Sequence, residues 1–193
     1  KSSRIEGNTY SLLETETLIK THQEAVGHTK EEAAMILNHK TAFDTILTNR
    51  EDFKIMDVSG IIQLHNILIQ GLEVDPGIRQ HPVGITGSSF RPLDNQWQIR
   101  EASEKLVKVM NSSHHPLEKA LIALSMVAYI QPFADGNKRT SRMLANAVLV
   151  AHDYYPISYR GINETKYKQA LIYFYEQNSL SELKRILIEQ YEF

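Results

Sequence analysis

The sequence predicts a single all-α domain with one short flap, and three observations lead to that fold class. Apolar residues recur at helical spacing through most of the 193 residues. Several of these segments begin at a capping box, which is a start signal for helices. Helix-breaking Pro and Gly residues gather instead in one stretch, 73–96. A chain of this length can bury one sizeable core, so we expect residues 1–193 to form one domain.

The first three helices are predicted from their capping residues. A capping box at 11–14 opens a helix that runs to about Glu24, and a second box at 29–32 opens the next helix. Asp57 caps a third helix, which Gly71 closes. The apolar residues at helical spacing in the second and third helices are Ala33, Ala34, Ile36, Leu37, Ala42, Ile46, Ile61, Leu64, Ile67 and Leu68.

Pro and Gly residues recur through the stretch 73–96 and prevent a helix there. Val83 and Ile85 lie two residues apart within it, which favours an extended conformation. We therefore expect a short β-hairpin over about 79–92, the only β element of the chain, and we call this segment the flap.

Helices resume after the flap over 97–111, 116–130, 138–152 and 164–175, and a last helix is capped at 179–182. The 116–130 helix is apolar on almost every side, which predicts a central and buried position. The 138–152 helix also carries many apolar residues. Two packed helices would hold the turn between them rigidly, and rigid support suits a site in which positioning and electrostatics supply most of the rate.

The composition is that of an ordinary soluble protein, with 42% hydrophobic and 23% charged residues. A net charge of −2 gives no basic field, so we expect no nucleic-acid partner. The absence of cysteine excludes disulfides and thiolate metal sites and fits a cytoplasmic protein. No apolar run approaches the roughly 20 residues that span a bilayer, so no membrane partner is expected. The lack of a signal peptide carries little weight, because the chain opens at Lys1 without a methionine.

The turn between the 116–130 and 138–152 helices carries the most informative residues of the chain. The sequence over 131–142 is Gln-Pro-Phe-Ala-Asp-Gly-Asn-Lys-Arg-Thr-Ser-Arg. Backbone N–H groups at a helix start attract anions, glycine lets a phosphate approach, and arginine supplies fork-shaped donors. A carboxylate beside them suits Mg²⁺, which prefers oxygen ligands. The pattern predicts a seat for a polyphosphate and its metal ion. The alternative is a loop of turn-forming residues that caps an ordinary basic helix.

Arg139 and Arg142 lie three residues apart, and hence on one face of the first helical turn. Two guanidinium groups in this arrangement repel each other unless an anion lies between them. The alternative is a pair of solvated surface cations. The eight histidines give no comparable signal, because none of them forms a metal-ligand spacing. His65 lies close to the apolar face of its helix, as a core histidine would.

The segment 131–142 resembles the signature of the Fic family, His-x-Phe-x-Asp/Glu-Gly-Asn-Gly/Lys-Arg-x-x-Arg. Every defining position matches except the first, where Gln131 stands in place of histidine. The segment 2–7, Ser-Ser-Arg-Ile-Glu-Gly, is similar to the family's inhibitory motif, Ser/Thr-x-x-x-Glu-Gly/Asn, in the subclass that carries it on the N-terminal side. The resemblance extends more weakly through the flap and the helices around it, and so covers nearly the whole chain.

The resemblance implies a Fic-type helical domain and a protein adenylyltransferase. Such an enzyme transfers AMP from MgATP to a Ser, Thr or Tyr hydroxyl of a protein and releases pyrophosphate. ATP and Mg²⁺ are then the ligands and a protein is the substrate, while a homodimer is left open. Lys138 stands where the family more commonly has glycine, a variant that includes a phosphorylating branch. Arg142, in contrast, is typical of the adenylylating orientation.

The resemblance also implies a role for each site residue. Asp135 would hold Mg²⁺ against the phosphates, Arg139 would contact the middle phosphate, and Arg142 the terminal one. The implied nucleotide-binding residues are Gly136, Asn137, Lys138, Arg139, Arg142 and Tyr167. The backbone amides of 136–138 and the Asn137 side chain would receive phosphate oxygens, and Tyr167 would line the base pocket. The flap residues that would align a target segment by backbone pairing are Val83, Ile85 and Thr86.

The segment of about 1–10 receives an inhibitory role by resemblance. Glu6 would pair with Arg142 and block the seat of the terminal phosphate, and Ser2 is the hydroxyl position of the same motif. A partly desolvated Arg–Glu pair is stronger than a surface pair, and the loss of either partner leaves a stranded charge.

Gln131 is the one departure from the signature. The family's histidine at this position takes the proton from the target hydroxyl as the hydroxyl oxygen attacks phosphorus. A glutamine amide has no usable basicity near neutral pH, and loss of a positioned general base typically costs about 10²–10⁴ in rate. We therefore expect impaired transfer. Three explanations stay open: a substitution introduced to silence the enzyme, natural drift to a nucleotide-binding pseudoenzyme, and altered chemistry. An inhibitory glutamate is useful only where there is activity to restrain, which favours the first explanation or a recent loss.

Several functions therefore stay open, and AMP transfer restrained by Glu6 is the leading one. A second is a regulatory module that binds nucleotide without chemistry. A third is removal of AMP from a modified protein, with Glu6 positioning the attacking water. The fourth is phosphate transfer, which differs from AMP transfer in the phosphate of ATP that reaches the target.

Overall fold

The computed structural model describes residues 2–191, and the elements in that range are helices. The predicted domain, 1–193, and the predicted inhibitory segment, about 1–10, therefore include residues that lie outside the described part. The helices are α1 (Ser2–Ile5), α2 (Leu12–Thr21), α3 (Lys30–Thr48), the 3₁₀ helix η1 (Arg50–Phe53), α4 (Val58–Leu68), α5 (Gln96–Ser112), α6 (Pro116–Ile130), α7 (Asn137–Ala151), α8 (Glu164–Gln177) and α9 (Ser181–Tyr191). No strand occurs among the described residues, and the predicted all-α fold class is confirmed.

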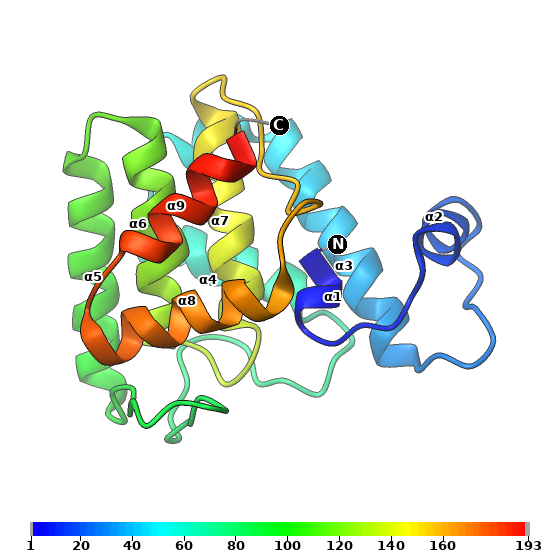
Figure 1. The fold of residues 1–193 in the computed structure, drawn as a ribbon, viewed down its shortest axis with the longest axis horizontal. Helices are drawn as coiled ribbons and strands as arrows, with labels where there is room; N and C mark the ends of the chain where they lie inside the picture. The colour runs from blue at the N-terminus through cyan, green and yellow to red at the C-terminus, as the bar shows by residue number, and fades with distance from the viewer. Residues whose placement is uncertain (1, 192–193) are drawn as a thin grey trace.

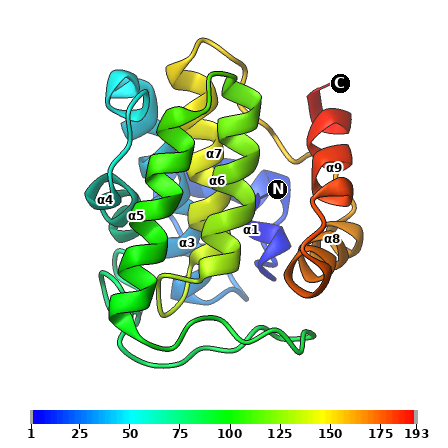
Figure 2. The ribbon, with the colours of Figure 1, turned by 90° about the vertical axis from the view of Figure 1, so that its left-hand side faces the viewer.

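Helices α6 and α7 form the centre of the molecule, as their apolar sequences predict. Every residue of α7 except Lys138 is buried. Among the described helices, α6 and α7 make the most extensive mutual contact. Figure 2 shows α5, α6 and α7 side by side, with α4 to the left and α8 and α9 to the right. The turn between α6 and α7 is thus held at both ends by buried helices.

The ends of the helices mostly follow the capping residues, and the predicted boxes of α2 and α3 both form. The predicted end of α2 near Glu24 was wrong. The helix ends at Thr21, because His22 adopts the left-handed conformation (φ 56°) and closes it. The start of α9 is also later than predicted, at Ser181. The Ser179 hydroxyl lies 3.1 Å from the Ser181 hydroxyl at this point.

The flap, 79–92, is an irregular loop and not the predicted β-hairpin. Pro82 and Pro92 have no N–H to give to a strand ladder, and glycines between them weaken an extended conformation. The tip of the loop is fixed from outside instead, because the Ser89 N–H donates to the Glu176 carboxylate of α8 at 2.9 Å. Figure 2 shows this loop running below the layer of α5, α6 and α7 toward α8.

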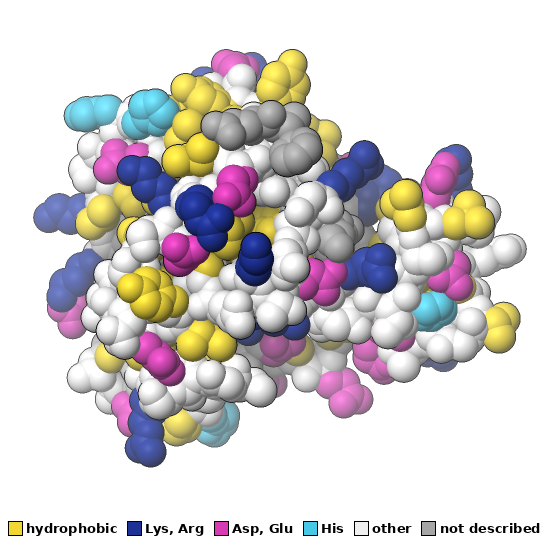
Figure 3. Space-filling view, viewed as in Figure 1, with side chains coloured by type: hydrophobic (Ala, Val, Ile, Leu, Met, Phe, Trp, Pro, Cys, Tyr) yellow, Lys and Arg dark blue, Asp and Glu magenta, His cyan; other side chains and the backbone are white. Residues whose placement is uncertain are grey.

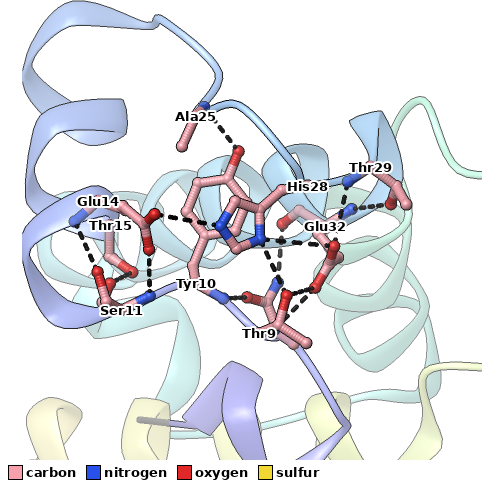
Figure 4. A network of polar contacts seen from close by, with 10 residues as sticks. Thr9, Tyr10, Ser11, Glu14, Thr15, Ala25, His28, Thr29 and Glu32 are labelled. Atoms are coloured by element: carbon pink, nitrogen blue, oxygen red, sulfur yellow. Dashed lines mark hydrogen bonds and ion pairs between the residues drawn. The ribbon is translucent and has the colours of Figure 1, made fainter.

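The chain that follows α1 is fastened to α2 and α3 by a polar network (Figure 4). Thr9 donates through both its N–H and its hydroxyl to Glu32 Oε1, each at 2.7 Å. His28 lies between Glu32 and Glu14, with its Nε2 3.3 Å from Glu14 Oε1. Its ring centroid is 4.0 Å from that of the buried Tyr10, which belongs to a small second core. These contacts fix α2, which stands apart from the bundle in Figure 1.

We expect this network to make the stability of the protein depend on pH. Hydrogen bonds from Ser11 lower the pKa of Glu14 from 4.5 to about 2, and hydrogen bonds from Thr9 lower that of Glu32 from 4.5 to about 2. A pKa that is lower in the folded state contributes stability above the unfolded pKa, and this contribution is lost as pH falls through the folded value. The loss should therefore occur between pH 4.5 and about 2.

Urea unfolding followed by circular dichroism tests this prediction, with Thr9→Val Ser11→Ala as the variant. The variant should have a lower unfolding free energy than the unaltered chain near neutral pH, because each of the two carboxylates loses a hydroxyl partner and keeps only its other donors. The difference should narrow below the unfolded pKa of about 4.5. An equal difference at neutral and at strongly acidic pH would contradict the assignment.

Charged side chains are mixed on the surface rather than separated by sign. Figure 3 shows Lys and Arg interspersed with Asp and Glu over the viewed face. Within residues 2–191, no helix has both the length and the apolar character needed to cross a lipid bilayer.

Candidate functional site

One polar cavity of about 250 Å³ brings together four segments that are far apart in the sequence. They are the residue after α1, helix α3, the flap and the turn that leads from the end of α6 to the start of α7. The residues that line it are Glu6, Met35, Val83, Gly84, Ile85, Thr86, Gln131, Ala134, Asp135, Gly136, Asn137, Lys138 and Arg139. The cavity therefore collects most of the residues that the sequence singled out, including the three flap residues.

The loop between α6 and α7 is held from below by His65 of α4. The His65 ring is fully buried and stacks on Phe133, with centroids 3.7 Å apart and planes 4° apart. Its Nε2 lies 2.9 Å from the Asp135 carbonyl oxygen, to which it donates. Burial lowers the pKa of His65, which keeps the ring neutral. The expectation of a core histidine is confirmed, and the residue also supports the signature loop.

Asn137 fixes the same loop from within. Its Oδ1 accepts from the Phe133 N–H at 2.9 Å, and its Nδ2 donates to the Phe133 carbonyl at 2.8 Å. The sequence interpretation gave this side chain to a phosphate. In the structure both ends of its amide bind the backbone of Phe133 and close the loop.

Helix α7 starts at the cavity without a side-chain cap. Gly136, in the N-cap position, has a left-handed backbone with φ 81°, which glycine adopts without strain. A Cβ placed there would lie 3.4 Å from an Arg139 guanidinium nitrogen and 3.5 Å from the His65 ring. These are ordinary contact distances, so the position favours glycine for its backbone angle. The uncapped N–H groups make this end of α7 attractive to anions.

Asp135 and Arg139 form an ion pair at the edge of the cavity. Arg139 is buried, and one of its nitrogens lies 3.0 Å from Asp135 Oδ2, whereas the Asp135 side chain is 71% exposed. A second Arg139 nitrogen lies 3.5 Å from the Leu68 carbonyl oxygen. The Asp135 carboxylate is therefore accessible from the cavity and neutralised from one side only.

Arg142 is 1% exposed, and its donors are directed at the segment that carries α1. Its Nε donates to the Ser2 hydroxyl at 2.9 Å, one terminal nitrogen donates to Glu6 Oε1 at 2.7 Å, and the other donates to the Ser2 carbonyl at 3.2 Å. Burial lowers the pKa of Arg142, but Glu6, Tyr167 and Tyr159 outweigh this effect and raise it. The guanidinium is thus charged, desolvated and fully paired.

The two arginines of the signature are therefore not a bare cationic pair. Arg139 has Asp135 as its counter-ion, and Arg142 has Glu6. Of the two interpretations made from the spacing, the solvated surface pair was wrong, whereas the expectation of a nearby anion is confirmed. The arginines are not solvated surface cations, and the anions beside them are carboxylates of the chain itself.

Tyr167 is fully buried and lies against Arg142, not in the wall of the polar cavity. Its ring centroid is 5.9 Å from the Arg142 guanidinium carbon, and Tyr159 covers the same group at 6.0 Å. Burial raises the pKa of both tyrosines. These rings shield the Arg142–Glu6 pair from water, and Tyr159 is a neighbour that the sequence interpretation missed.

Gln131 ends α6 in the left-handed conformation, with φ 52° and ψ 58°. Its side chain is 7% exposed, and its Nε2 donates to the Ala128 carbonyl at 2.5 Å. The backbone carbonyl of Gln131 accepts from Arg79 Nε at 2.7 Å. Arg79 was also missed, because a single arginine among Pro and Gly residues carries no sequence signal.

Comparison with known proteins agrees with this geometry. A family model described as Fic/DOC family matches residues 55–149. The protein adenylyltransferase Fic of Drosophila ananassae is 28% identical over 166 residues, which cover 84% of this chain and 33% of that protein. The chain thus spans about a third of the length of the curated relatives that it matches.

Solved structures share the fold of this chain. Fic-1 from C. elegans superposes with a TM-score of 0.85 at 22% identity, covering 99% of this chain and 58% of that one. A Fic family protein from Desulfovibrio desulfuricans G20 gives a TM-score of 0.83 at 20% identity, with 98% and 59% covered. At these identities the likeness concerns the fold, and it confirms the predicted Fic-type helical domain. A Fic domain, matched by the family model over residues 55–149, thus lies within this chain.

Proposed function

We propose that this chain is a Fic-type protein adenylyltransferase that Glu6 holds inactive and that Gln131 weakens. The observation that carries the proposal is the polar cavity in which the signature loop, the flap and Glu6 meet. A polar cavity at a helix N-terminus suits an anionic ligand. The names of the relatives, protein adenylyltransferase Fic, support AMP as the transferred group and a protein as the acceptor.

The start of α7 fits a magnesium-bound triphosphate. The exposed Asp135 carboxylate, the uncapped N–H groups of the helix and the left-handed Gly136 lie around one cavity. Within residues 2–191, no group of three or more His, Cys, Asp or Glu side chains has an arrangement that could hold a metal ion. Mg²⁺ does not need such a group, because it commonly takes one carboxylate together with phosphate oxygens. When bound, it would neutralise charge that builds up on the phosphates during transfer.

Nucleotide binding would exchange one ion pair for two new contacts. Asp135 and Arg139 neutralise each other at 3.0 Å in the ligand-free chain. In the proposed complex, Asp135 turns to the metal ion and Arg139 becomes free to bind a phosphate. The Arg139 side chain is buried and lies close to the Leu68 carbonyl, so little side-chain entropy is left to lose on binding.

Glu6 inhibits by occupying Arg142. All three nitrogens of that guanidinium bind the segment that carries α1, so none is available to a terminal phosphate. A triphosphate that enters the cavity with Glu6 in place would lack this contact and meet the Glu6 carboxylate. Activation therefore requires that Glu6 leave Arg142.

Transfer would join the target hydroxyl oxygen to the α-phosphorus and break the bond from that phosphorus to pyrophosphate, while the hydroxyl proton is removed. Gln131 cannot accept this proton, and its Nε2–H is bound to the Ala128 carbonyl. This contact favours a second candidate function, a module that binds nucleotide without transferring any part of it.

Labelled ATP separates the candidate functions. The proposal requires that the double variant Glu6→Gly Gln131→His transfers the label from the α-phosphate of ATP to protein. Transfer from the γ-phosphate alone would mean a phosphotransferase, and MgATP binding without either transfer would mean a binding module. Release of AMP from a labelled protein, dependent on Glu6, would mean AMP removal. If Glu6→Gly does not bind MgATP at all, the cavity is not a nucleotide site.

Asp135→Asn should weaken the binding of MgATP by about tenfold, or about 1.4 kcal/mol, because Asn keeps the size of Asp but loses the charge that Mg²⁺ needs. Calorimetry in the Glu6→Gly background measures this effect. Binding of ATP with EDTA present should not weaken, since Arg139 is then free of its counter-ion.

Asp153→Asn is the matched control for Asp135→Asn. Asp153 is an exposed aspartate just beyond the end of α7, and it pairs with Arg50 at 2.8 Å. The Asp153→Asn substitution should have no effect on nucleotide binding. Equal MgATP affinity in Asp135→Asn and in its parent would remove Asp135 as the metal ligand.

A further inference from the structure

Arg79 lies at the base of the flap and joins it to the signature loop. Its Nε donates to the Gln131 carbonyl at 2.7 Å, and one terminal nitrogen donates to the His81 carbonyl at 2.8 Å. The other terminal nitrogen donates to the Leu93 carbonyl. The Arg79 N–H also donates to the Pro132 carbonyl at 3.0 Å. One side chain thus ties both ends of the flap to the residue that stands in the position of the catalytic base.

Among residues 2–191, Arg79 has no carboxylate within ion-pair distance, and only Asp94 stabilises its charge from farther away. The residue is 4% exposed, and no ion pair to it occurs in the described part of the chain. Its acceptors are three backbone carbonyls, and the Gln131 carbonyl belongs to the C-terminal end of α6. That end carries partial negative charge from the helix dipole, which favours a cation there. A planar fork can satisfy three carbonyls that diverge in direction, whereas a lysine ammonium cannot do so with the same fixed geometry.

A second attachment holds the far part of the flap. Glu176 of α8 accepts from the Ser89 N–H at 2.9 Å and from the Ser88 hydroxyl at 2.8 Å. Between this attachment and Arg79, the flap passes along the cavity, with Ile85 buried in the core and Thr86 exposed. The exposed edge of the flap is therefore fixed at both ends with respect to residue 131.

We infer that Arg79 is a positioning residue, which sets the place of a target segment on the flap relative to residue 131 and the nucleotide. The inference rests on the proposed adenylyl transfer and adds to it the group that aligns the protein acceptor. Without Arg79 the flap would move relative to the α6–α7 turn, while the phosphate seat at the start of α7 would keep its own contacts. Transfer to a protein hydroxyl needs this alignment, whereas transfer to water does not.

Two acceptors therefore test the inference in the Glu6→Gly Gln131→His background, with α-labelled ATP as the probe. Arg79→Met should lower labelling of protein, measured on the chain itself, by about tenfold or more. Release of AMP to water and the affinity for MgATP should stay within about twofold. Arg79→Lys should restore part of the labelling, because it keeps the charge at the end of α6 but loses the fork.

Arg91→Met serves as the matched control, because Arg91 is an exposed arginine on the same flap with no such contacts. This variant should label protein to the same extent as the Glu6→Gly Gln131→His chain from which it is made. Labelling and AMP release that fall in the same proportion in Arg79→Met would indicate a general folding defect and overturn the inference. Full recovery in Arg79→Lys, or an equal loss in Arg91→Met, would overturn it too.

Amide hydrogen exchange tests the inference even if no variant transfers AMP. It is measured on the chain that keeps Glu6 and Gln131. Arg79→Met should speed exchange of the flap amides while those of α6 and α7 stay protected. Glu176→Ala, at an exposed position, should speed exchange of the Ser88 and Ser89 amides and leave Arg79 in place. Unchanged flap exchange in Arg79→Met would contradict the inference, whereas absence of transfer alone would contradict only the proposed function.

Discussion

Gln131→His is expected to raise the rate of AMP transfer by about 10²–10⁴-fold in a chain that also carries Glu6→Gly. The reason is local, since the phosphate seat, the flap and the support of His65 do not involve the Gln131 amide. The position already faces the cavity at the end of α6, opposite the flap. Initial rates of label transfer from α-labelled ATP, at saturating Mg²⁺, measure the gain.

The pH dependence of the restored activity gives a separate check. A histidine acts as a base only when it is neutral, so the rate should rise with pH through a pKa near about 6.5 and then level off. Gln131→Asn, which replaces one amide with another, should give no gain. A rate that is the same in the Gln, Asn and His forms would mean that residue 131 removes no proton.

Glu6→Gly is expected to strengthen the binding of MgATP by at least about tenfold, or about 1.4 kcal/mol. The substitution removes a carboxylate that lies 2.7 Å from Arg142 and faces the cavity. It leaves the buried guanidinium without its counter-ion, so the ligand-free protein should lose about 2 kcal/mol of unfolding free energy. Bound nucleotide supplies a new anion and should raise the unfolding temperature of this variant more than that of its parent.

Calorimetry and thermal unfolding with and without MgATP measure both effects of Glu6→Gly. Glu24→Gly makes the same change of charge at an exposed position between α2 and α3, and should alter neither quantity by much. If Glu6→Gly is destabilised but binds MgATP no better than its parent, Glu6 has a structural role and does not inhibit. If neither quantity changes, the Arg142–Glu6 pair contributes nothing to stability and does not hinder the binding of MgATP.

The signature arginines illustrate what spacing can and cannot predict. Their separation by three residues placed them on one face of α7 and indicated an anion nearby. The spacing could not show which anion, because Glu6 comes from the other end of the sequence. The family resemblance did connect Glu6 with Arg142. A family motif records which residues the fold brings together, and the spacing of residues within one helix does not.

Asn137 and Arg79 have side-chain contacts that neither the spacing nor the family resemblance predicted. The sequence interpretation gave the Asn137 amide to a phosphate, whereas the structure uses both of its ends to close the signature loop on Phe133. Arg79 carried no signal at all, because its role depends on three carbonyls that only the folded chain brings around it. The flap failed as a hairpin for a related reason, since its donors are bound by α8 and not by a partner strand.

The sequence by itself determined the all-α class and the burial of α6 and α7, and it predicted the candidate site at the turn between them. Apolar periodicity and capping are local patterns, so they can be recognised without the fold. Only the tertiary structure decided that Asp135 neutralises Arg139, how the flap is attached and that Tyr167 covers Arg142. The last two contacts join residues distant in sequence, and they form because buried charges and carbonyls must find partners once water is excluded.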